Sequence, residues 1–378
     1  MKVHQEERLI INFNDGPFVE AKGSRHKKYK VEFINSETDN VVHSTKIENN
    51  MWAKCNQKWN IPWIIRINGK IHHTHDLEGK NVKVSFESKS IGDTLAWIPQ
   101  VARFAKIYKC NVTVSTFYNN WFINHPEYKH LSFINPGENG KFYSHYKLGW
   151  FRNDNDKWDE GTYHPKQPNT IPLAQAACDI LNIPYEEVSY GINFTPKERP
   201  LPDRYICIGP KSTAGLKEWP VHYWEMLAKE LNVLGYKVVS ISHEGFSAPG
   251  IINRGGMKWE DSINYLYHAD LFIGLGSGLS WMNWTLGKFT VMINNFNPYG
   301  YDFTQNMIQM QNHSVCNGCW ADTRFTFDKG NWDWCPRHQG TPSQHICHSA
   351  IRPEHVLDKV KYVLKYRINE KDMGQRVF

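Results

Sequence analysis

The 378-residue sequence has neither a long uninterrupted hydrophobic segment nor a block of like charges. Its longest weakly charged run, residues 271–293, contains glycines at positions 274, 276, 278 and 287 and several polar side chains. This composition suits a strand, a loop and a helix of a folded domain better than a helix in lipid. The first eight residues lack an apolar core and a small-residue cleavage site, so we expect no secretory signal and a cytoplasmic chain.

Cysteine is too scarce for a disulfide scaffold, because only eight cysteines occur in the chain. Four are scattered singly, whereas the other four, Cys316, Cys319, Cys335 and Cys347, fall within one short stretch. In a reducing compartment, clustered cysteines indicate a metal site before they indicate disulfides. Four thiolates suit a closed tetrahedral site for zinc or for a single iron ion, and such a site is structural rather than catalytic. Four histidines offer alternative ligands: His313, His338, His345 and His348.

Neither sign of charge dominates, since 44 lysines and arginines stand against 38 aspartates and glutamates and give a net charge of +6. A mild positive balance spread along the chain fits an anionic small ligand as well as a nucleic acid. The 22% of charged and 14% of aromatic residues exclude a disordered chain, a collagen and a simple coiled coil. The length predicts two or three folded domains.

The N-terminal third begins with short strands and then changes to alternating strands and helices. The clearest strands are residues 29–34, 63–67 and 82–86. The strand at 82–86, a helix over 95–105 and a strand at 110–115 form a β-α-β unit, which implies a parallel sheet.

A second α/β region follows a linker with prolines at 196, 200 and 202. Its strands are expected at 205–209, 236–241, 271–274 and 289–293, and its helices at 221–234, 263–269 and 280–286. Two Rossmann-like halves joined by a linker predict an enzyme that binds its ligand between them.

The loop between the strand at 82–86 and the next helix contains Ile91, Gly92 and Asp93. Parallel sheets place their ligands at this end of a strand. Asp93 would repel a phosphate but is suited to accept a proton from a hydroxyl. The alternative is that Asp93 caps the helix N-terminus, which is a common position for aspartate.

Two further loops follow strands of the second region. Gly276, Ser277, Gly278, Leu279 and Ser280 lie before a helix, where successive backbone N–H groups can bind an anion. The loop is neither a Walker A motif nor a full dinucleotide fingerprint, so tight packing is an equal alternative.

The other loop contains Ser212, Thr213 and Lys217. Lys217 is placed to neutralise a leaving diphosphate, although most lysines are simply solvated.

Taken together, these motifs resemble the bacterial autotransporter heptosyltransferases, relatives of the lipopolysaccharide heptosyltransferases. The segments that carry the resemblance are Phe13–Gly16, Ile91–Pro99, Ser212–Thr213, Lys217–Trp219, Phe272–Trp281, Cys316–Trp320, Trp334–His338 and Cys347. The resemblance runs in order along nearly the whole chain, with residues 151–200 as its weakest part. Where lipopolysaccharide heptosyltransferases usually have Asp-Thr-Gly and a histidine, this chain has Gly276-Ser277-Gly278 and Trp281. That difference favours the protein-modifying branch.

The resemblance implies an inverting glycosyltransferase of the GT-B type that moves heptose from ADP-heptose to Ser or Thr hydroxyls of autotransporter passenger domains. It implies that Asp93 is the general base and that Lys217 binds the donor diphosphate. It further implies that the nucleotide sugar is bound by Ile91, Gly92, Ser212, Thr213, Lys217 and residues 276–280, of which 277–280 lie at the nucleotide. It also implies that the four clustered cysteines bind ferric iron, in preference to zinc, and that the chain forms a large ring-like homo-oligomer.

The resulting organisation is an α/β fold of the GT-B type with two additions. The expected parts are a β-domain over 1–85, a first Rossmann-like domain over 86–198, a second over 199–310, a four-cysteine metal-binding subdomain over 311–350, and a C-terminal helix over 351–378. Alternatives are a glycosyltransferase that uses another nucleotide sugar or a lipopolysaccharide acceptor, a metal-stapled nucleic-acid-binding protein, and a catalytically inactive assembly protein.

Overall fold

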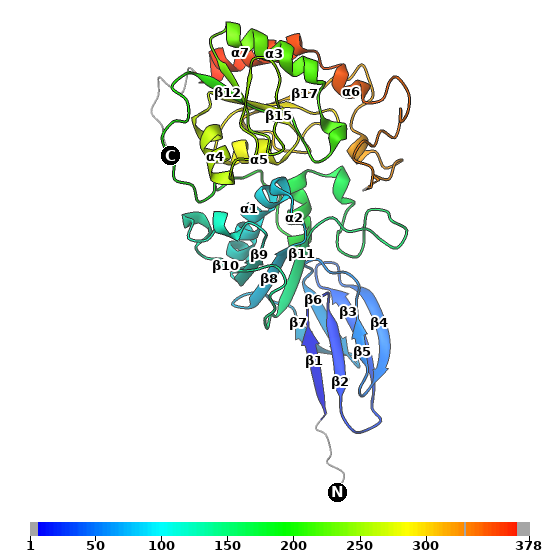
Figure 1. Cartoon of the computed structure of the whole chain (residues 1–378). Coiled ribbons are helices and arrows are strands. Elements are labelled where there is room, and N and C mark those ends of the chain that lie inside the picture. The colour runs from blue at the N-terminus through cyan, green and yellow to red at the C-terminus, as the bar shows by residue number, and fades with distance from the viewer. Residues whose placement is uncertain (1–6, 329, 369–378) are drawn as a thin grey trace. The chain divides into compact units, whose positions relative to one another are not determined.

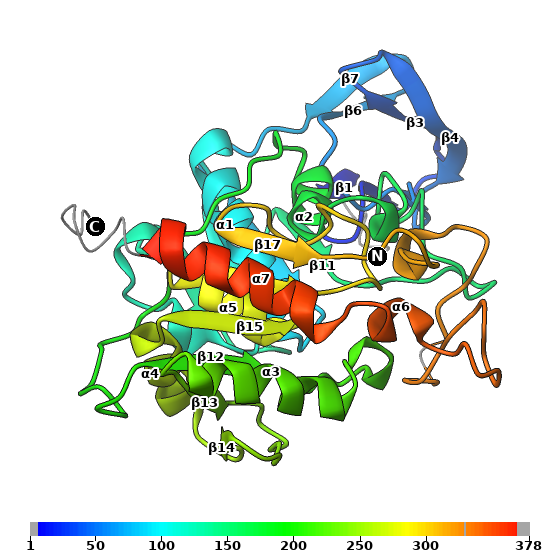
Figure 2. The same cartoon turned by 90° about the horizontal axis from the view of Figure 1, so that it is seen from above.

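The computed structural model describes residues 7–328 and 330–368 (Figures 1 and 2). The first six residues of the predicted β-domain, residue 329 and the last ten residues of the predicted C-terminal helix lie outside this part of the chain. The chain divides into two compact units. Unit 1 contains residues up to 89 together with 97–168 and 173–188, and unit 2 contains residues 90–96, 169–172 and those from 189 onward.

Two antiparallel sheets form the N-terminal part of unit 1. One has the order β1-β2-β5, with β1 (Arg8–Asn12), β2 (Phe18–Lys22) and β5 (Trp52–Lys54). The other has the order β4-β3-β6-β7, with β4 (Asn40–Glu48), β3 (Lys28–Asn35), β6 (Trp63–Ile67) and β7 (Lys70–Thr74). Asn68 and Gly69 join β6 to β7 with positive φ angles of 48° and 81°, as a two-residue hairpin turn requires. The predicted strands at 29–34 and 63–67 are confirmed as β3 and β6.

A parallel sheet of order β10-β9-β8-β11 completes unit 1. Its strands are β8 (Asn81–Phe86), β9 (Asn111–Ser115), β10 (Ser132–Ile134) and β11 (Ser144–Leu148). Helix α1 (Ile91–Tyr108) connects β8 to β9, which confirms the predicted β-α-β unit. Helix α2 (Leu173–Leu181) packs against α1, and the Trp97 indole N–H donates to the Leu173 carbonyl at 2.9 Å.

Unit 2 contains a six-stranded parallel sheet of order β14-β13-β12-β15-β16-β17. The strands are β12 (Tyr205–Gly209), β13 (Lys237–Ser240), β14 (Ile251–Asn253), β15 (Leu271–Leu275), β16 (Thr290–Ile293) and β17 (Met307–Met310). This order is that of a doubly wound Rossmann sheet. The four predicted strands are confirmed within about two residues, whereas β14 and β17 were not predicted.

Helices α3 (Val221–Val233), α4 (Trp259–His268), α5 (Gly278–Thr285) and α7 (Pro353–Val363) surround this sheet. Helices α3 and α7 lie side by side on one face (Figures 1 and 2). Their buried side chains, such as Trp224, Leu231 and Val360, pack on Ile206 and Ile273 of the sheet. The central strands are buried at every position, because helices cover a parallel sheet on both faces.

Shorter helices occupy the connections: Asn119–Trp121, Pro126–Tyr128, Pro168–Thr170, Gly215–Lys217, Cys319–Ala321, α6 (Ile346–Ser349) and the π-helical Leu364–Ile368. Within residues 7–328 and 330–368, no helix has both the length and the apolar character that crossing a membrane requires.

Candidate functional site

The candidate site lies in unit 2, where the strand order of the six-stranded sheet reverses. Strands β12 and β15 are neighbours, but the chain continues from them to opposite sides of the sheet. In such sheets the crevice at the carboxyl ends of these two strands binds the ligand. The loop after β12 carries Lys217, and the loop after β15 carries residues 276–280, so the topology brings both predicted loops to one edge.

The loop after β15 turns sharply into helix α5. A side chain at Gly276 would place its Cβ 2.4 Å from the Asn294 side-chain nitrogen, and one at Gly278 would place it 3.0 Å from the Ile91 Cβ. Close packing therefore requires a glycine at 276, whereas a Cβ at 278 would fit only if Ile91 moved by a few tenths of an ångström. The predicted helix over 280–286 begins two residues earlier, at Gly278.

Ser277 and Ser280 have different roles in this loop. Ser277 is the N-cap residue in extended conformation, with a φ of −146°. The Ser280 hydroxyl donates to the Leu275 carbonyl at 2.6 Å, and its amide donates to the Ser277 carbonyl at 3.1 Å. Because Ser280 is engaged within the loop, the amides of Gly278 and Leu279 are the groups at this helix N-terminus that remain suited to an anion.

Lys217 ends the short helix Gly215–Lys217 and reaches the neighbouring loop. Its Nζ donates to the Gly276 carbonyl at 2.9 Å and lies 5.4 Å from the centre of the Phe296 ring. Burial lowers the pKa of Lys217, while the charges of Asp302 and Asp93 raise it. A half-buried ammonium group beside a helix N-terminus makes this edge of the sheet electropositive.

Ser212 and Thr213, from the same loop as Lys217, do not join this cluster directly. The Ser212 hydroxyl accepts the Ala214 amide at 3.3 Å and so shapes the turn, whereas Thr213 is exposed. Their predicted contact with the nucleotide sugar remains a prediction.

Asp93 lies in the first turn of α1, which groups with unit 2. Its side chain is buried. The Ser90 hydroxyl accepts the Asp93 amide at 3.4 Å, so Ser90 rather than Asp93 occupies the capping position. A side chain at Gly92 would place its Cβ 3.0 Å from Cδ1 of Trp281, and this close approach brings the turn of Asp93 against helix α5. The alternative that Asp93 is the N-cap residue is therefore wrong.

The buried carboxylate of Asp302, which the sequence did not single out, connects these loops through hydrogen bonds. Asp302 accepts hydrogen bonds from the Trp281 indole at 3.2 Å, the Asn294 amide at 3.0 Å and the Asn297 amide at 2.9 Å. Burial raises the pKa of Asp302, and the hydrogen bond from Asn297 and the charge of Lys217 oppose that shift. Of these donors, Trp281 packs on Gly92 and Asn294 packs on Gly276. Asp302 therefore connects the turn of Asp93 to the loop after β15, whose Gly276 carbonyl accepts a hydrogen bond from Lys217.

The sequence feature that could have indicated this network is the asparagine-rich segment Asn294–Asn297, which directly follows β16. Polar side chains at the carboxyl end of a parallel strand are expected near a ligand.

The four clustered cysteines lie in the segment after β17. Cys335 is buried and the other three are half-buried. Burial raises the pKa of Cys316, Cys319 and Cys347, in the last case to about 12, and neighbouring thiols of the same set raise it further in each case. The thiols are thus close enough to influence one another.

These thiols do not converge as ligands, however. In the part of the chain that the structure describes, no three His, Cys, Asp or Glu side chains are arranged to hold a metal ion. The donor set suits iron or zinc chemically, but its ligand geometry is not assembled here.

The cysteine segment is bonded to the loops of the candidate site. The Leu216 amide donates to the Trp332 carbonyl at 2.9 Å, next to Lys217. The Gly318 amide donates to the Asn295 carbonyl at 2.8 Å, next to Phe296. The conformation of the cysteine segment is therefore coupled to the positions of Lys217 and of the Phe296 ring.

Known proteins with similar sequences are autotransporter heptosyltransferases. The chain is 27% identical to autotransporter heptosyltransferase BAHTCr of Citrobacter rodentium, over 92% of this chain and 87% of that protein. It is also 27% identical to autotransporter heptosyltransferase Aah of Escherichia coli, over 97% and 96%. A further relative, 25% identical over 94% of this chain and 86% of its own length, is described as the inactive autotransporter heptosyltransferase BimC of Burkholderia thailandensis. No family model matches the chain.

Solved structures of a further autotransporter heptosyltransferase, TibC, have a similar fold. The crystal structure of TibC from enterotoxigenic Escherichia coli, described as an iron-containing dodecameric glycosyltransferase, matches with a TM-score of 0.83 at 25% identity, covering 95% of this chain and 96% of that one. The same protein in complex with ADP-D-β-D-heptose matches with a TM-score of 0.83 at 24% identity, over 94% and 96%. These similarities extend over nearly all of the chain: it resembles the autotransporter heptosyltransferases in sequence and in its GT-B-like fold, and it is a glycosyltransferase.

Proposed function

We propose that this protein transfers heptose from ADP-heptose to Ser or Thr hydroxyls of an autotransporter protein, with inversion at the anomeric carbon. The observation that carries the proposal is the position of Lys217 on the Gly276 carbonyl at the switch point. Burial lowers the Lys217 pKa, and the charges of Asp302 and of Asp93 act in the opposite direction, which places the Asp93 carboxylate near this cation. A cation and a buried carboxylate at one edge of a Rossmann sheet provide the two functions that glycosyl transfer to a hydroxyl requires.

The donor diphosphate is assigned to Lys217 and to the amides of Gly278 and Leu279. A leaving diphosphate accumulates negative charge as the anomeric bond breaks, and oriented donors in a site of low dielectric stabilise that charge. The amides lie at the N-terminus of α5, whose dipole favours an anion. ADP-heptose is favoured because TibC is described in complex with ADP-D-β-D-heptose.

Asp93 is assigned as the general base. The acceptor hydroxyl gains nucleophilicity when its proton passes to the carboxylate as the oxygen attacks the anomeric carbon. The C–O bond to the diphosphate breaks in the same step, so a single displacement inverts the configuration. The autotransporter acceptor is supported by the names of the relatives.

Co-expression tests this proposal most directly. The protein, an autotransporter passenger domain and an ADP-heptose supply are combined, and the intact mass of the passenger is measured. We expect mass increments of one heptose each, mapped to Ser or Thr by fragmentation. A passenger of unchanged mass, with lipopolysaccharide or another nucleotide sugar consumed instead, would favour the alternative transferases. No sugar transfer at all would place the chain with the inactive relative, and salt-sensitive oligonucleotide binding would favour the nucleic-acid-binding alternative.

We further propose that Cys316, Cys319, Cys335 and Cys347 bind one structural iron ion, because TibC is described as iron-containing. Replacing Cys335, the buried thiol, with Ser is expected to abolish the visible absorption of the purified protein and lower its iron content to background, while Cys207→Ser should leave both unchanged. Metal analysis and the absorption spectrum provide the measurement. A colourless wild-type protein with stoichiometric zinc would show that the metal assignment is wrong.

The dodecameric state of TibC also supports a homo-oligomer for this chain. Light scattering of the purified protein measures it.

A further inference from the structure

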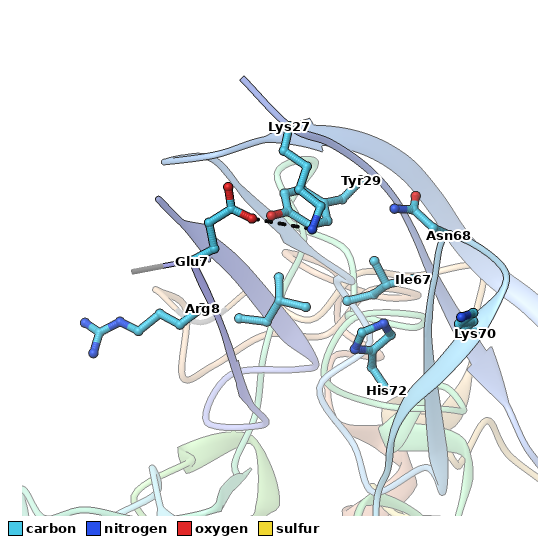
Figure 3. A pocket seen from close by; sticks show the side chains of 9 residues that line it. Glu7, Arg8, Lys27, Tyr29, Ile67, Asn68, Lys70 and His72 are labelled. Carbon is cyan, nitrogen blue, oxygen red and sulfur yellow. Dashed lines mark hydrogen bonds and ion pairs between the residues drawn. The ribbon is translucent and has the colours of Figure 1, made fainter. Parts of the chain in front are cut away.

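The N-terminal sheets of unit 1 leave two strand edges open around one cavity. In the sheet orders β1-β2-β5 and β4-β3-β6-β7, strands β1 and β7 are terminal, so each has an edge without a strand partner among the described residues. A cavity of about 430 Å³ lies between them, with lining residues from β1, from β3 and its preceding residue, and from the β6–β7 hairpin (Figure 3). We call this cavity and its two strand edges the edge groove.

The floor of the edge groove is apolar. Tyr29 and Ile67 are buried members of the core between the two sheets, and Leu9 packs against that core. An extended chain that pairs with a strand edge directs every second side chain to one face. A small or apolar side chain therefore suits the floor at alternate positions.

The rim of the edge groove is basic. Arg8, Lys70 and His72 are exposed along it, and Figure 3 shows Arg8 on β1 with its guanidinium directed away from His72, which lies on the β6–β7 hairpin. The rim contains one acid, Glu7, whose carboxylate is 3.4 Å from the Lys27 Nζ and 3.8 Å from the Arg25 Nε. Within the described residues, no carboxylate lies within ion-pair distance of Arg8 or Lys70. The excess positive charge favours an acidic partner.

We propose that the edge groove binds an acidic, extended segment of the acceptor polypeptide by strand addition. Strand addition recognises a polypeptide through main-chain hydrogen bonds, so it tolerates varied sequences around the modified hydroxyls. The occupant is one strand rather than a second copy of this chain, because nine residues line the cavity, whereas a stable protein interface uses about 20–30 residues a side. The proposal rests on the proposed function, which makes the acceptor a polypeptide.

The test compares two double variants of the full-length protein. Arg8→Glu with Lys70→Glu reverses the rim charge, and Lys46→Glu with Lys229→Glu makes the same change of net charge at exposed positions outside the groove. With an acidic passenger fragment as acceptor, we expect the rim variant to raise KM for the fragment about tenfold while kcat and KM for ADP-heptose stay unchanged. The control variant should match the wild type.

Amide hydrogen exchange supplies a second measurement that needs no substitution. The acidic fragment is expected to slow exchange in β1 or β7, and the same fragment with its Asp and Glu changed to Asn and Gln should do so less. Unchanged KM in the rim variant together with unchanged exchange in both strands would overturn the proposal. A lower molar mass of the rim variant in light scattering would do so as well, since it would assign the groove to a second copy.

Failure of the proposed function has a different signature. Wild-type protein that transfers sugar to no polypeptide would refute that function, and the effect of the fragment on exchange in β1 and β7 would still decide whether the groove binds it.

Discussion

Replacing Asp93 with Asn is expected to lower the rate of heptose transfer about a thousandfold while leaving the affinity for ADP-heptose within about twofold of the wild type. The amide has nearly the shape of the carboxylate, so the packing of this buried side chain is preserved. It cannot accept the proton of the acceptor hydroxyl, however. Transfer is measured by mass spectrometry of the acceptor, and donor affinity by calorimetry with ADP-heptose.

A matched control separates catalysis from helix stabilisation. Asp93 is an acid in the first turn of α1, and such acids favour the helix N-terminus whether or not they are catalytic. Glu354 holds the same kind of position in α7 and is exposed. Glu354→Gln should leave transfer unchanged. Substantial turnover by the Asp93→Asn variant, with a thermal stability change like that of the Glu354→Gln variant, would assign Asp93 to the helix alone.

The sequence predicted the elements of unit 2 because their hydrophobic patterns are local. Strands 205–209 and 271–274 are continuous apolar runs, and both occur in the structure as β12 and β15. Strands β14 and β17 were missed because they are short, at three and four residues, and lie at the sheet edges where burial is incomplete. The amphipathic patterns predicted helices reliably, and their ends shifted by a few residues.

The candidate site was predictable from the sequence only where the residues of a single loop indicated its function. Glycines 276 and 278 marked a close backbone approach, and the structure identifies what approaches them, Asn294 and Ile91. The role of Asp302 could not be read from its neighbours in sequence. Two of its donors, Asn294 and Asn297, lie in its own loop after β16, but the third, Trp281, comes from helix α5, and only the folded sheet brings that helix to the loop.

For the cysteine cluster, the sequence indicated the kind of site but could not predict its geometry. Its composition indicated a metal site from the sequence, yet ligand geometry depends on side-chain positions that spacing alone does not determine. What the structure adds is the bonding of this segment to the loops around Lys217 and Phe296. Loss of the proposed iron ion is therefore expected to weaken donor binding indirectly, through Lys217.

Removing the ammonium group of Lys217 is expected to have the second large effect. Lys217→Ala should weaken ADP-heptose binding at least tenfold and lower kcat about a hundredfold, because the charge on the leaving diphosphate is then stabilised only by the amides of α5. Lys217→Met removes the same charge but keeps an apolar stem over the Phe296 ring, so similar losses in both variants would trace the effect to the charge. Calorimetry with ADP and steady-state kinetics provide the measurements.

Lys211 supplies the control from the same loop. Its Nζ is 2.8 Å from the Glu218 carboxylate, so its charge is already paired, and Lys211→Met should change donor affinity little. The pH dependence gives an independent check on Lys217. Burial lowers its pKa, so in the free enzyme the ammonium form is lost at a lower pH than for an ordinary lysine, and donor affinity should fall as the pH rises through that value. The Lys217→Met variant should lack this fall; the same fall in that variant, or unchanged ADP affinity, would remove Lys217 from the donor site.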